Sequence, residues 1–286
     1  MRFRAPSRAE VPATRFEHPV FRDFAPRLHL LYGNAWPSLQ QLNAELDGRR
    51  HFFADRPLRF VPQTPELVAD GRHYEARIWE TGQIATRTEN WHDLFNALMW
   101  LDRPALKSAV NAAYFFELHR APPGQRTRAQ AALTHFDEAG ALVLLNDDGL
   151  LQAWDGHDWR TLLGAGCERW KAGAEVLLFG HALLEHALQP GLWPVAKCLV
   201  VRVSGSASRA AAANSVAEAI ACGQLLRDPQ ELRPLPLAGL PGWHAEAGAP
   251  GFFEETPCFR QAKPGRRYPK PWIPPAGGLQ AAGWLR

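Results

Sequence analysis

The sequence EVLLFGHALLEHALQPGLWPVAKCLVVRVSGSASRAAAANSVAEAIA, residues 175–221, decides the fold that we expect. It holds two apolar runs of strand length, each followed by a helix-forming run: Glu175 to Phe179, His181 to Leu188, Lys197 to Val203 and Ala210 to Ala221. Strands that alternate with helices favour a sheet that is at least partly parallel. We therefore expect an α/β or α+β fold, a single domain with a small mixed sheet and packed helices.

The chain before this stretch predicts further elements of both kinds. Apolar stripes and capping signals indicate helices over Pro37 to Arg49, Asn90 to Leu101, Pro104 to His119 and Asp147 to Trp154. Aromatic and β-branched content indicates strands over Leu58 to Pro62, Tyr74 to Glu80, Ala129 to Phe136 and Ala141 to Leu145. The segment from Ala129 fits the start of a helix equally well. Asp137 to Gly140 is then expected to form a tight turn between two strands.

Charge divides the chain into three parts. Residues 260–286 carry six Lys or Arg residues and no acid, so the net charge of +3 combines +6 there with about −3 elsewhere. We expect a partly ordered lead-in over 1–25, a globular domain over 26–259 and a disordered, proline-rich basic tail over 260–286. Tyr268 and Trp272 in the tail also fit single-stranded nucleic acid. Because the body lacks a basic stripe, we do not expect a nucleic-acid partner.

Segment lengths and cysteine spacing restrict the protein class. No apolar run approaches the ~20 residues of a membrane helix, and no signal-type apolar stretch follows the basic N-terminus. We expect a soluble, cytoplasmic protein with no membrane partner. The four cysteines lie at least 24 residues apart, which excludes zinc ribbons and thioredoxin-type redox pairs. A P-loop, a dinucleotide fingerprint, a nucleophile elbow and a His-Glu-x-x-His zinc helix are also missing from the sequence.

Four segments carry a family resemblance. They are ETGQIATRTENWHDLFNALMW (80–100), LTHFDEAG (133–140), FGHALLE (179–185) and GLPGW (239–243). Together, and in this order, they resemble the signature of a bacterial family known as domain of unknown function 3025, over roughly residues 20–260. The chain departs from that pattern at His135 and in AEAG (245–248). The resemblance implies a family without an established activity, so it assigns no catalytic residue.

The helix expected from Asn90 has two unlike faces. At 100° per residue, Trp91, Leu94, Phe95, Leu98 and Leu101 form a core face. The other face holds His92, Asn96 and Trp100 in place of the usual Lys and Glu, which indicates a second partner: the fold itself, a subunit or a ligand. The helix dipole favours a neutral His92, which can accept a proton or bind a metal, and Asn96 can orient it. A histidine hydrogen-bonded to backbone is the alternative for His92, and Asp93 fits a helix cap.

A second polar group lies at the next strand-to-helix junction. His181 and Glu185 are spaced i, i+4 after Gly180, where ligands of α/β sheets bind. Glu185 can hold the ring of His181 in one tautomer, although an ordinary helix-surface pair has the same spacing. Asp137 and Glu138 are favoured as turn residues, but two adjacent carboxylates can also bind a metal or act as acid and base, and Asp137 is a further metal-ligand candidate. Arg87 can hold an anionic substrate or pair with Glu80.

These residues lead to two functional hypotheses. The first is a small-molecule enzyme, a hydrolase or other acid–base catalyst, with His92, Asn96, His181 and Glu185 as catalytic residues. Arg87, Glu80 and Trp100 would then contact the substrate, and a divalent metal ion held by His92, His181 or Asp137 would be the cofactor. This hypothesis requires His92 and His181 to converge. The alternative is a protein-interaction module that uses the face of His92, Asn96 and Trp100, and an exposed Trp100 beside a flat apolar surface would support it.

Overall fold

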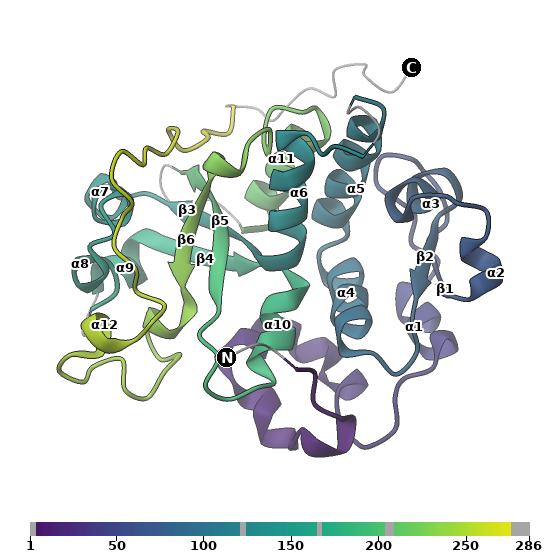
Figure 1. The fold of residues 1–286 in the computed structure, drawn as a ribbon, viewed down its shortest axis with the longest axis horizontal. Coiled ribbons are helices and arrows are strands. Elements are labelled where there is room, and N and C mark those ends of the chain that lie inside the picture. Colours follow the sequence, from purple (N-terminus) through teal and green to yellow (C-terminus); the bar gives the residue numbers. More distant parts are fainter. Residues whose placement is uncertain (1–3, 121–123, 165–167, 204–208, 276–286) are drawn as a thin grey trace.

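The computed structural model describes residues 4–120, 124–164, 168–203 and 209–275, which form an α+β fold around two sheets (Figure 1). The larger sheet has the strand order β4-β3-β5-β6. Its strands are β3 (Gly140–Leu145), β4 (Ala174–Leu178), β5 (Val195–Arg202) and β6 (Leu232–Pro236). β3 pairs in parallel with β5, whereas β4 and β6 run antiparallel to their neighbours. The expected mixed sheet is confirmed.

Both faces of β3 are buried, because helices cover the sheet on each side. Along a strand, alternate side chains point to opposite faces. Leu142 and Leu144 pack in the core that includes Val110, Phe136 and Val216. That core is supplied by three helices: α5 (Pro104–Leu118), α6 (Arg128–Ala139) and α11 (Arg209–Ala221).

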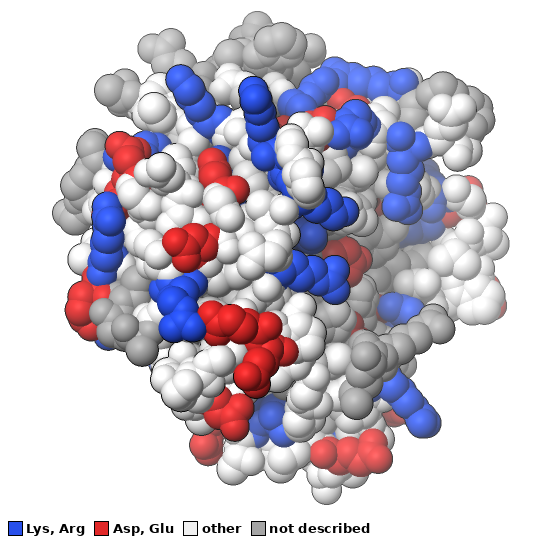
Figure 2. All heavy atoms as spheres, turned by 60° about the vertical axis from the view of Figure 1, so that its left-hand side comes forward, with Lys and Arg blue, Asp and Glu red and all other residues white. Residues whose placement is uncertain are grey.

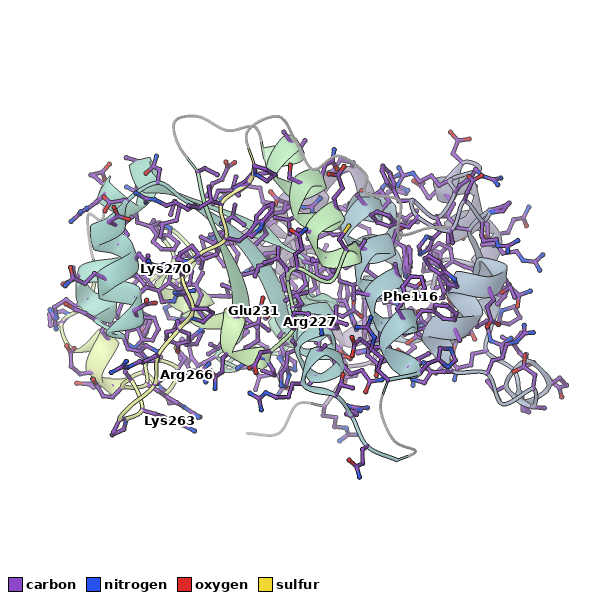
Figure 3. All side chains as sticks on the ribbon, turned by 90° about the horizontal axis from the view of Figure 1, so that it is seen from above. Phe116, Arg227, Glu231, Lys263, Arg266 and Lys270 are labelled. Carbon is purple, nitrogen blue, oxygen red and sulfur yellow. The ribbon has the colours of Figure 1, made fainter. Side chains whose placement is uncertain are left out.

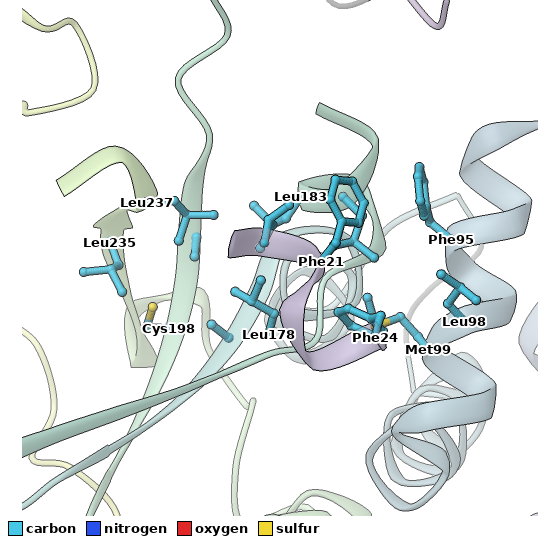
Figure 4. Close-up of a cluster of buried hydrophobic side chains, with 14 of the residues drawn as sticks. Phe21, Phe24, Phe95, Leu98, Met99, Leu178, Leu183, Cys198, Leu235 and Leu237 are labelled. Carbon is cyan, nitrogen blue, oxygen red and sulfur yellow. The ribbon is translucent and has the colours of Figure 1, made fainter. Parts of the chain in front are cut away.

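The opposite face of the sheet, which includes Val143 of β3, packs against the N-terminal segment and a second set of helices. These elements are η3 (Pro19–Leu30), α4 (Trp91–Asp102), α7 (Asp148–Asp155), α8 (Trp159–Leu163) and α10 (His181–Ala187). Figure 4 shows Phe21 and Phe24 of η3 between the sheet and Phe95 and Met99 of α4. Each of these four side chains is fully buried, so η3 fixes α4 at a set distance from the sheet.

The smaller sheet lies at the far end of the molecule, on the right in Figure 1. It pairs β1 (Arg59–Pro62) in parallel with β2 (Gln83–Thr86) and is flanked by three helices, α1 (Leu39–Leu46), α2 (Pro65–Val68) and α3 (Tyr74–Thr81). The remaining short elements are η1 (Arg8–Glu10), η2 (Ala13–Glu17), α9 (Glu168–Gly173), η4 (Pro229–Glu231), η5 (Leu237–Gly239) and α12 (Phe252–Glu255).

Two sequence predictions of local structure were wrong, the strand at Tyr74 to Glu80 and the hairpin turn at Asp137 to Gly140, and the structure decides between the two alternatives for Ala129 to Phe136. Tyr74 to Glu80 is the helix α3 and not a strand, because His73 caps its first turn and Gly82 ends it with φ of 71°. Ala129 to Phe136 is likewise helical, and a capping box between Thr127 and Gln130 starts α6. Asp137 and Glu138 therefore lie in the last turn of α6 and not in a hairpin turn.

The C-terminal basic segment, for which the sequence predicts disorder, runs along the sheet as far as residue 275. Arg202 donates its backbone N–H to the carbonyl of Trp272 at 2.8 Å, and Arg233 donates to the carbonyl of Pro269, also at 2.8 Å. Residues 276–286 lie outside the described residues. Among the described helices, none combines the length and the apolar character needed to cross a membrane.

Candidate functional site

The site begins where two chain segments cross at the edge of the larger sheet. β3 and β4 pair with Ala141 opposite Leu178, so the end of α6 and the start of α10 meet beside them. Gly180 donates its N–H to the carbonyl of Gly140 at 2.7 Å. A Cβ on Gly180 would lie 2.3 Å from the nitrogen of Gly140, so only glycine permits this approach. The crossing brings Asp137 and Glu138 next to His181.

Helix α4 packs against α10 and supplies the second histidine. The rings of His92 and His181 meet edge to face with centroids 4.4 Å apart, and their Nε2 atoms are 3.0 Å apart. His181 is 3% exposed, whereas the side chain of His92 is 33% exposed, so the pair lies at the wall of the protein with one ring open to solvent. The two groups that the sequence singled out thus converge.

Carboxylates stand around the two rings. Nδ1 of His92 donates to Oε2 of Glu185 at 3.0 Å. Among the described residues, Nδ1 of His181 is buried with no hydrogen-bond partner, and it faces Oδ2 of Asp137 at 3.9 Å. Glu138 lies on the side of the two Nε2 atoms, with carboxylate oxygens 3.6 Å from His181 and 4.0 Å from His92.

The contact between the two Nε2 atoms is either an N–H···N hydrogen bond between neutral rings or a contact across a shared cation. Because Glu185 only accepts hydrogen bonds, Nδ1 of His92 carries a hydrogen, and a neutral His92 then presents a bare lone pair at Nε2. If His181 donates to that lone pair, its own bare Nδ1 faces the carboxylate of Asp137. A proton or a metal ion between the rings removes the conflict. The hydrogen bond to Glu185 raises the pKa of His92, whereas burial lowers the pKa of His181 to about 3.

Lys107 anchors the polar groups behind the histidines. Its side chain is 4% exposed, and Nζ donates to Oδ1 of Asp137 at 2.6 Å and to Oδ1 of Asn96 at 2.8 Å. Asn96 in turn donates to the hydroxyl of Tyr74 at 2.9 Å. Burial acts to raise the pKa of Asp137, but Lys107 and His181 hold it below its ordinary value. Asp137 is therefore a fixed negative charge behind His181.

A neighbouring polar chain continues from α3 into α5. Asn111 donates to the carboxylate of Glu75 at 2.6 Å, and its Oδ1 lies 3.0 Å from Nε2 of His51. Burial, with a smaller contribution from Asp137, raises the pKa of Glu75 to about 7. Burial also lowers the pKa of His51 to about 4. Burial therefore favours the uncharged form of both side chains.

We expect Glu75→Gln to stabilise the protein at pH 8 and to have little effect at pH 4.5. The folded-state pKa of about 7 exceeds the ordinary 4.5, so ionisation of Glu75 costs stability as the pH rises from 4.5 to 7, and the full cost applies above 7. This shift in pKa alone corresponds to a loss of about 3 kcal/mol in the free energy of unfolding once Glu75 is ionised. Because water reaches the half-buried side chain, we expect a gain of about 1–2 kcal/mol.

Denaturant unfolding at the two pH values measures this effect. Glu80→Gln, on the exposed side of the same helix, is the matched control and should change stability by less than about 0.5 kcal/mol at either pH. A Glu75→Gln gain that is equal at pH 8 and pH 4.5 would contradict a raised pKa.

The remaining predicted site residues occupy different positions. Arg87 binds Asp93 through its side chain, with the closest contact from Nη2 at 2.7 Å, and is itself half exposed at the rim. Glu80 pairs with Arg72 at 3.3 Å on the surface of α3 and does not pair with Arg87. Trp100 is 1% exposed and belongs to the core. Asn96 contacts Lys107 and Tyr74. Glu185 orients His92, whereas the sequence predicted that Glu185 would orient His181.

Sequence reasoning missed Lys107, and it gave metal binding by Glu138 only as the alternative to a turn. The turn was favoured because the segment before Glu138 was interpreted as a strand, which hides the helical spacing of Glu138. Lys107 gave a usable signal, because it stands among apolar residues on α5 in a chain with only five lysines. A lysine in an apolar stripe is rarely buried without an acidic partner.

Comparison with known proteins places the chain in a family. No curated protein and no solved structure matches it. The family model described as "Protein of unknown function (DUF3025)" matches residues 58–263, which include every residue of the histidine site. The match covers well over half of the chain, so this protein belongs to the DUF3025 family.

Proposed function

We propose that this protein is a metal-dependent hydrolase of small molecules, with a divalent metal ion held by His92, His181 and Glu138. The observation that carries the proposal is the approach of two Nε2 atoms to 3.0 Å, with a carboxylate beside them. A metal ion between the rings would use both Nε2 lone pairs as ligands, whereas a neutral pair makes a single N–H···N hydrogen bond and leaves the bare Nδ1 of His181 facing the carboxylate of Asp137.

The distances within the cluster suit one ion. Ligand nitrogen and oxygen atoms lie about 2.1 Å from a zinc-like ion, so two ligands of one ion are at most about 4.2 Å apart. The three separations of 3.0, 3.6 and 4.0 Å all fall within that limit. Two histidines and one carboxylate are typical of catalytic sites that keep a coordination position open for water or substrate.

The groups behind the ligands support the same interpretation. Metal-bound histidines commonly donate their second ring N–H to a carboxylate, which fixes the tautomer and increases ligand basicity. Glu185 accepts from His92 in this way, and Asp137 stands 3.9 Å from the unpartnered Nδ1 of His181. A small rotation of His181 towards Asp137 would complete the second pair. Lys107 holds Asp137 in place for it.

The proposed chemistry follows from the exposure of the site. A divalent ion lowers the pKa of a bound water molecule towards neutrality, and that water can attack an ester, amide or phosphoester. The side chains of His92 and Glu138 are 33% and 44% exposed, so substrate can reach this side of the cluster. Arg87, half exposed on the preceding loop, is available to hold an anionic group of the substrate. The alternative of an interaction module is not favoured, since Trp100 is buried.

The first test is metal binding by the full-length, tag-free protein. We expect calorimetric titration with Zn²⁺ or Mn²⁺ to give one site per chain, and His181→Ala or Glu138→Gln to weaken it by more than about 100-fold. Glu185→Gln should cost about 10–100-fold, because it removes only the orienting group. His29→Ala is the matched control. His29 also pairs with a glutamate, Glu45 at 2.9 Å, but has no second histidine beside it. Equal affinities for all variants would refute the site.

The second test is turnover. We expect the metal-loaded protein to hydrolyse at least one of bis(4-nitrophenyl) phosphate, 4-nitrophenyl phosphate and 4-nitrophenyl acetate, and Glu138→Gln to reduce the rate by about 100-fold or more. Circular dichroism and thermal unfolding of each variant separate lost chemistry from lost folding. Hydrolysis that is unchanged in Glu138→Gln would contradict the proposed role of the cluster.

A further inference from the structure

A cavity lies beside α6 and α10, the helices that carry Glu138 and His181. It has a volume of about 770 Å³, within the range of ligand pockets. Its walls come from α6, α10, β5, β6 and the segment that follows Cys258. Figure 3 shows Lys263 and Arg266 on that last segment, where it passes beside the sheet. We call this cavity the basic groove.

The charge of the basic groove has one sign. Among the lining residues that the structure describes, five are Lys or Arg and none is Asp or Glu. The five are Arg128, Lys197, Arg260, Lys263 and Arg266. The mildly acidic charge of residues 1–259 makes this concentration of positive charge a local feature. Figure 2 shows one face of the molecule, with Lys and Arg side chains to the right of its centre and above it and more acidic side chains below.

Most of these cations have no acidic partner. Arg128 binds the carboxylate of Asp228 through two nitrogens, with Nη2 at 2.8 Å from Oδ1. Within the described part of the chain, the other four cations form no ion pair. Lys197 is half-buried on β5, and burial together with the nearby Arg266 and Arg260 lowers its pKa. Like charges gathered around a half-buried lysine are unfavourable until an anion joins them.

The rest of the wall is preorganised for a ligand with a planar part. The hydroxyl of Tyr268 lies 3.0 Å from Nε2 of His157, and the guanidinium of Arg266 lies 4.7 Å from the centre of the Tyr268 ring. The contact between His157 and Tyr268 holds the basic segment against the domain, and the ring of Tyr268 in turn positions Arg266. Trp193, also half-buried, lines the groove with an indole surface on which an aromatic ring can stack.

We propose that the basic groove binds an organic polyphosphate that carries an aromatic ring, the chemistry of a nucleoside diphosphate or triphosphate. Lys197, Arg260 and Arg266 receive the phosphate groups, and Trp193 receives the ring. Arginine and lysine bind phosphate through charge-assisted hydrogen bonds, and several of them in one recess select for more than one phosphate. This ligand site is independent of the metal site, and its test uses different variants.

The test is equilibrium binding of ADP, pyrophosphate and adenosine to the full-length protein. We expect ADP to bind best, pyrophosphate more weakly and adenosine weakest, and we expect ADP affinity to fall with added salt. Lys197→Met and Arg266→Ala should each weaken ADP binding at least about tenfold. Arg267→Ala is the control, because it removes a cation from the same segment but not from the groove wall.

Three results would overturn the proposal. The first is the absence of saturable ADP binding up to about 1 mM, which corresponds to only about −4 kcal/mol. The second is equal loss of ADP binding in Arg267→Ala and in the two groove variants, which would indicate attraction to the basic segment in general. The third is tighter binding of a thymidine oligonucleotide than of ADP, which would indicate a single-strand surface.

Discussion

Lys107→Met is expected to lower the free energy of unfolding by about 3–5 kcal/mol, the range for breaking a buried ion pair by removal of one partner. The Lys107 side chain is 4% exposed, and its ammonium is bound by Asp137 and Asn96. Methionine fills a similar volume but leaves the carboxylate of Asp137, with 18% of its side chain exposed, without a counter-charge. The loss should be visible in urea unfolding at pH 7.

A matched surface pair separates this effect from loss of a lysine as such. Lys171 binds Glu168 at 2.8 Å, but both side chains are more than half exposed. Lys171→Met should therefore change stability by less than about 1 kcal/mol. The double variant Lys107→Met/Asp137→Leu should recover most of the loss, because no buried charge is left unpaired. If Lys107→Met lowers the free energy of unfolding no more than Lys171→Met does, the pair of Lys107 and Asp137 contributes little to stability.

The elements that could be predicted from sequence are those with strong local signals. Asn90 caps α4 by accepting from the N–H of Asp93, and the strands β3, β4 and β5 follow apolar runs. The assignments at α3 and α6 share one physical feature, since their capping residues, His73 and Thr127, stand just outside the segments that were interpreted. In α3 the aromatic and β-branched residues also suit a strand.

The sequence singled out the two histidines together with Glu185 and Asp137, but not which carboxylate serves which ring. His92 and His181 stood out because each lies at a helix start beside apolar residues. Which carboxylate serves which ring depends on the crossing of α4, α6 and α10, which is a tertiary property. Glu185 therefore binds His92 from another helix, although its i, i+4 spacing favours its neighbour His181. Trp100 was misplaced for the same reason, since α4 is covered on nearly all sides.

Gly180→Ala is expected to be a strongly damaging single-methyl addition near the site, with a loss of about 3 kcal/mol. The new Cβ would lie 2.3 Å from the nitrogen of Gly140 and 2.4 Å from Cα of Ala139, which are backbone atoms that cannot rotate away. Either β4 must separate from the start of β3, or α10 must shift away from α6. Thermal unfolding should show a decrease of about 6 °C or more in Tm.

Gly156→Ala provides the control for an added methyl group. Gly156 ends α7 with φ of −80°, and its nearest atom to a new Cβ lies at 3.4 Å, so we expect a change within about 0.5 kcal/mol. The two variants also differ in what they do to the histidine cluster. Gly180 precedes His181, so a shift of α10 widens the distance of 3.0 Å between the two Nε2 atoms and should weaken metal binding about 10-fold or more even where the protein stays folded. Unchanged metal affinity in a destabilised Gly180→Ala protein would mean that the crossing of the two glycines supports the fold without setting the geometry of the proposed ligands.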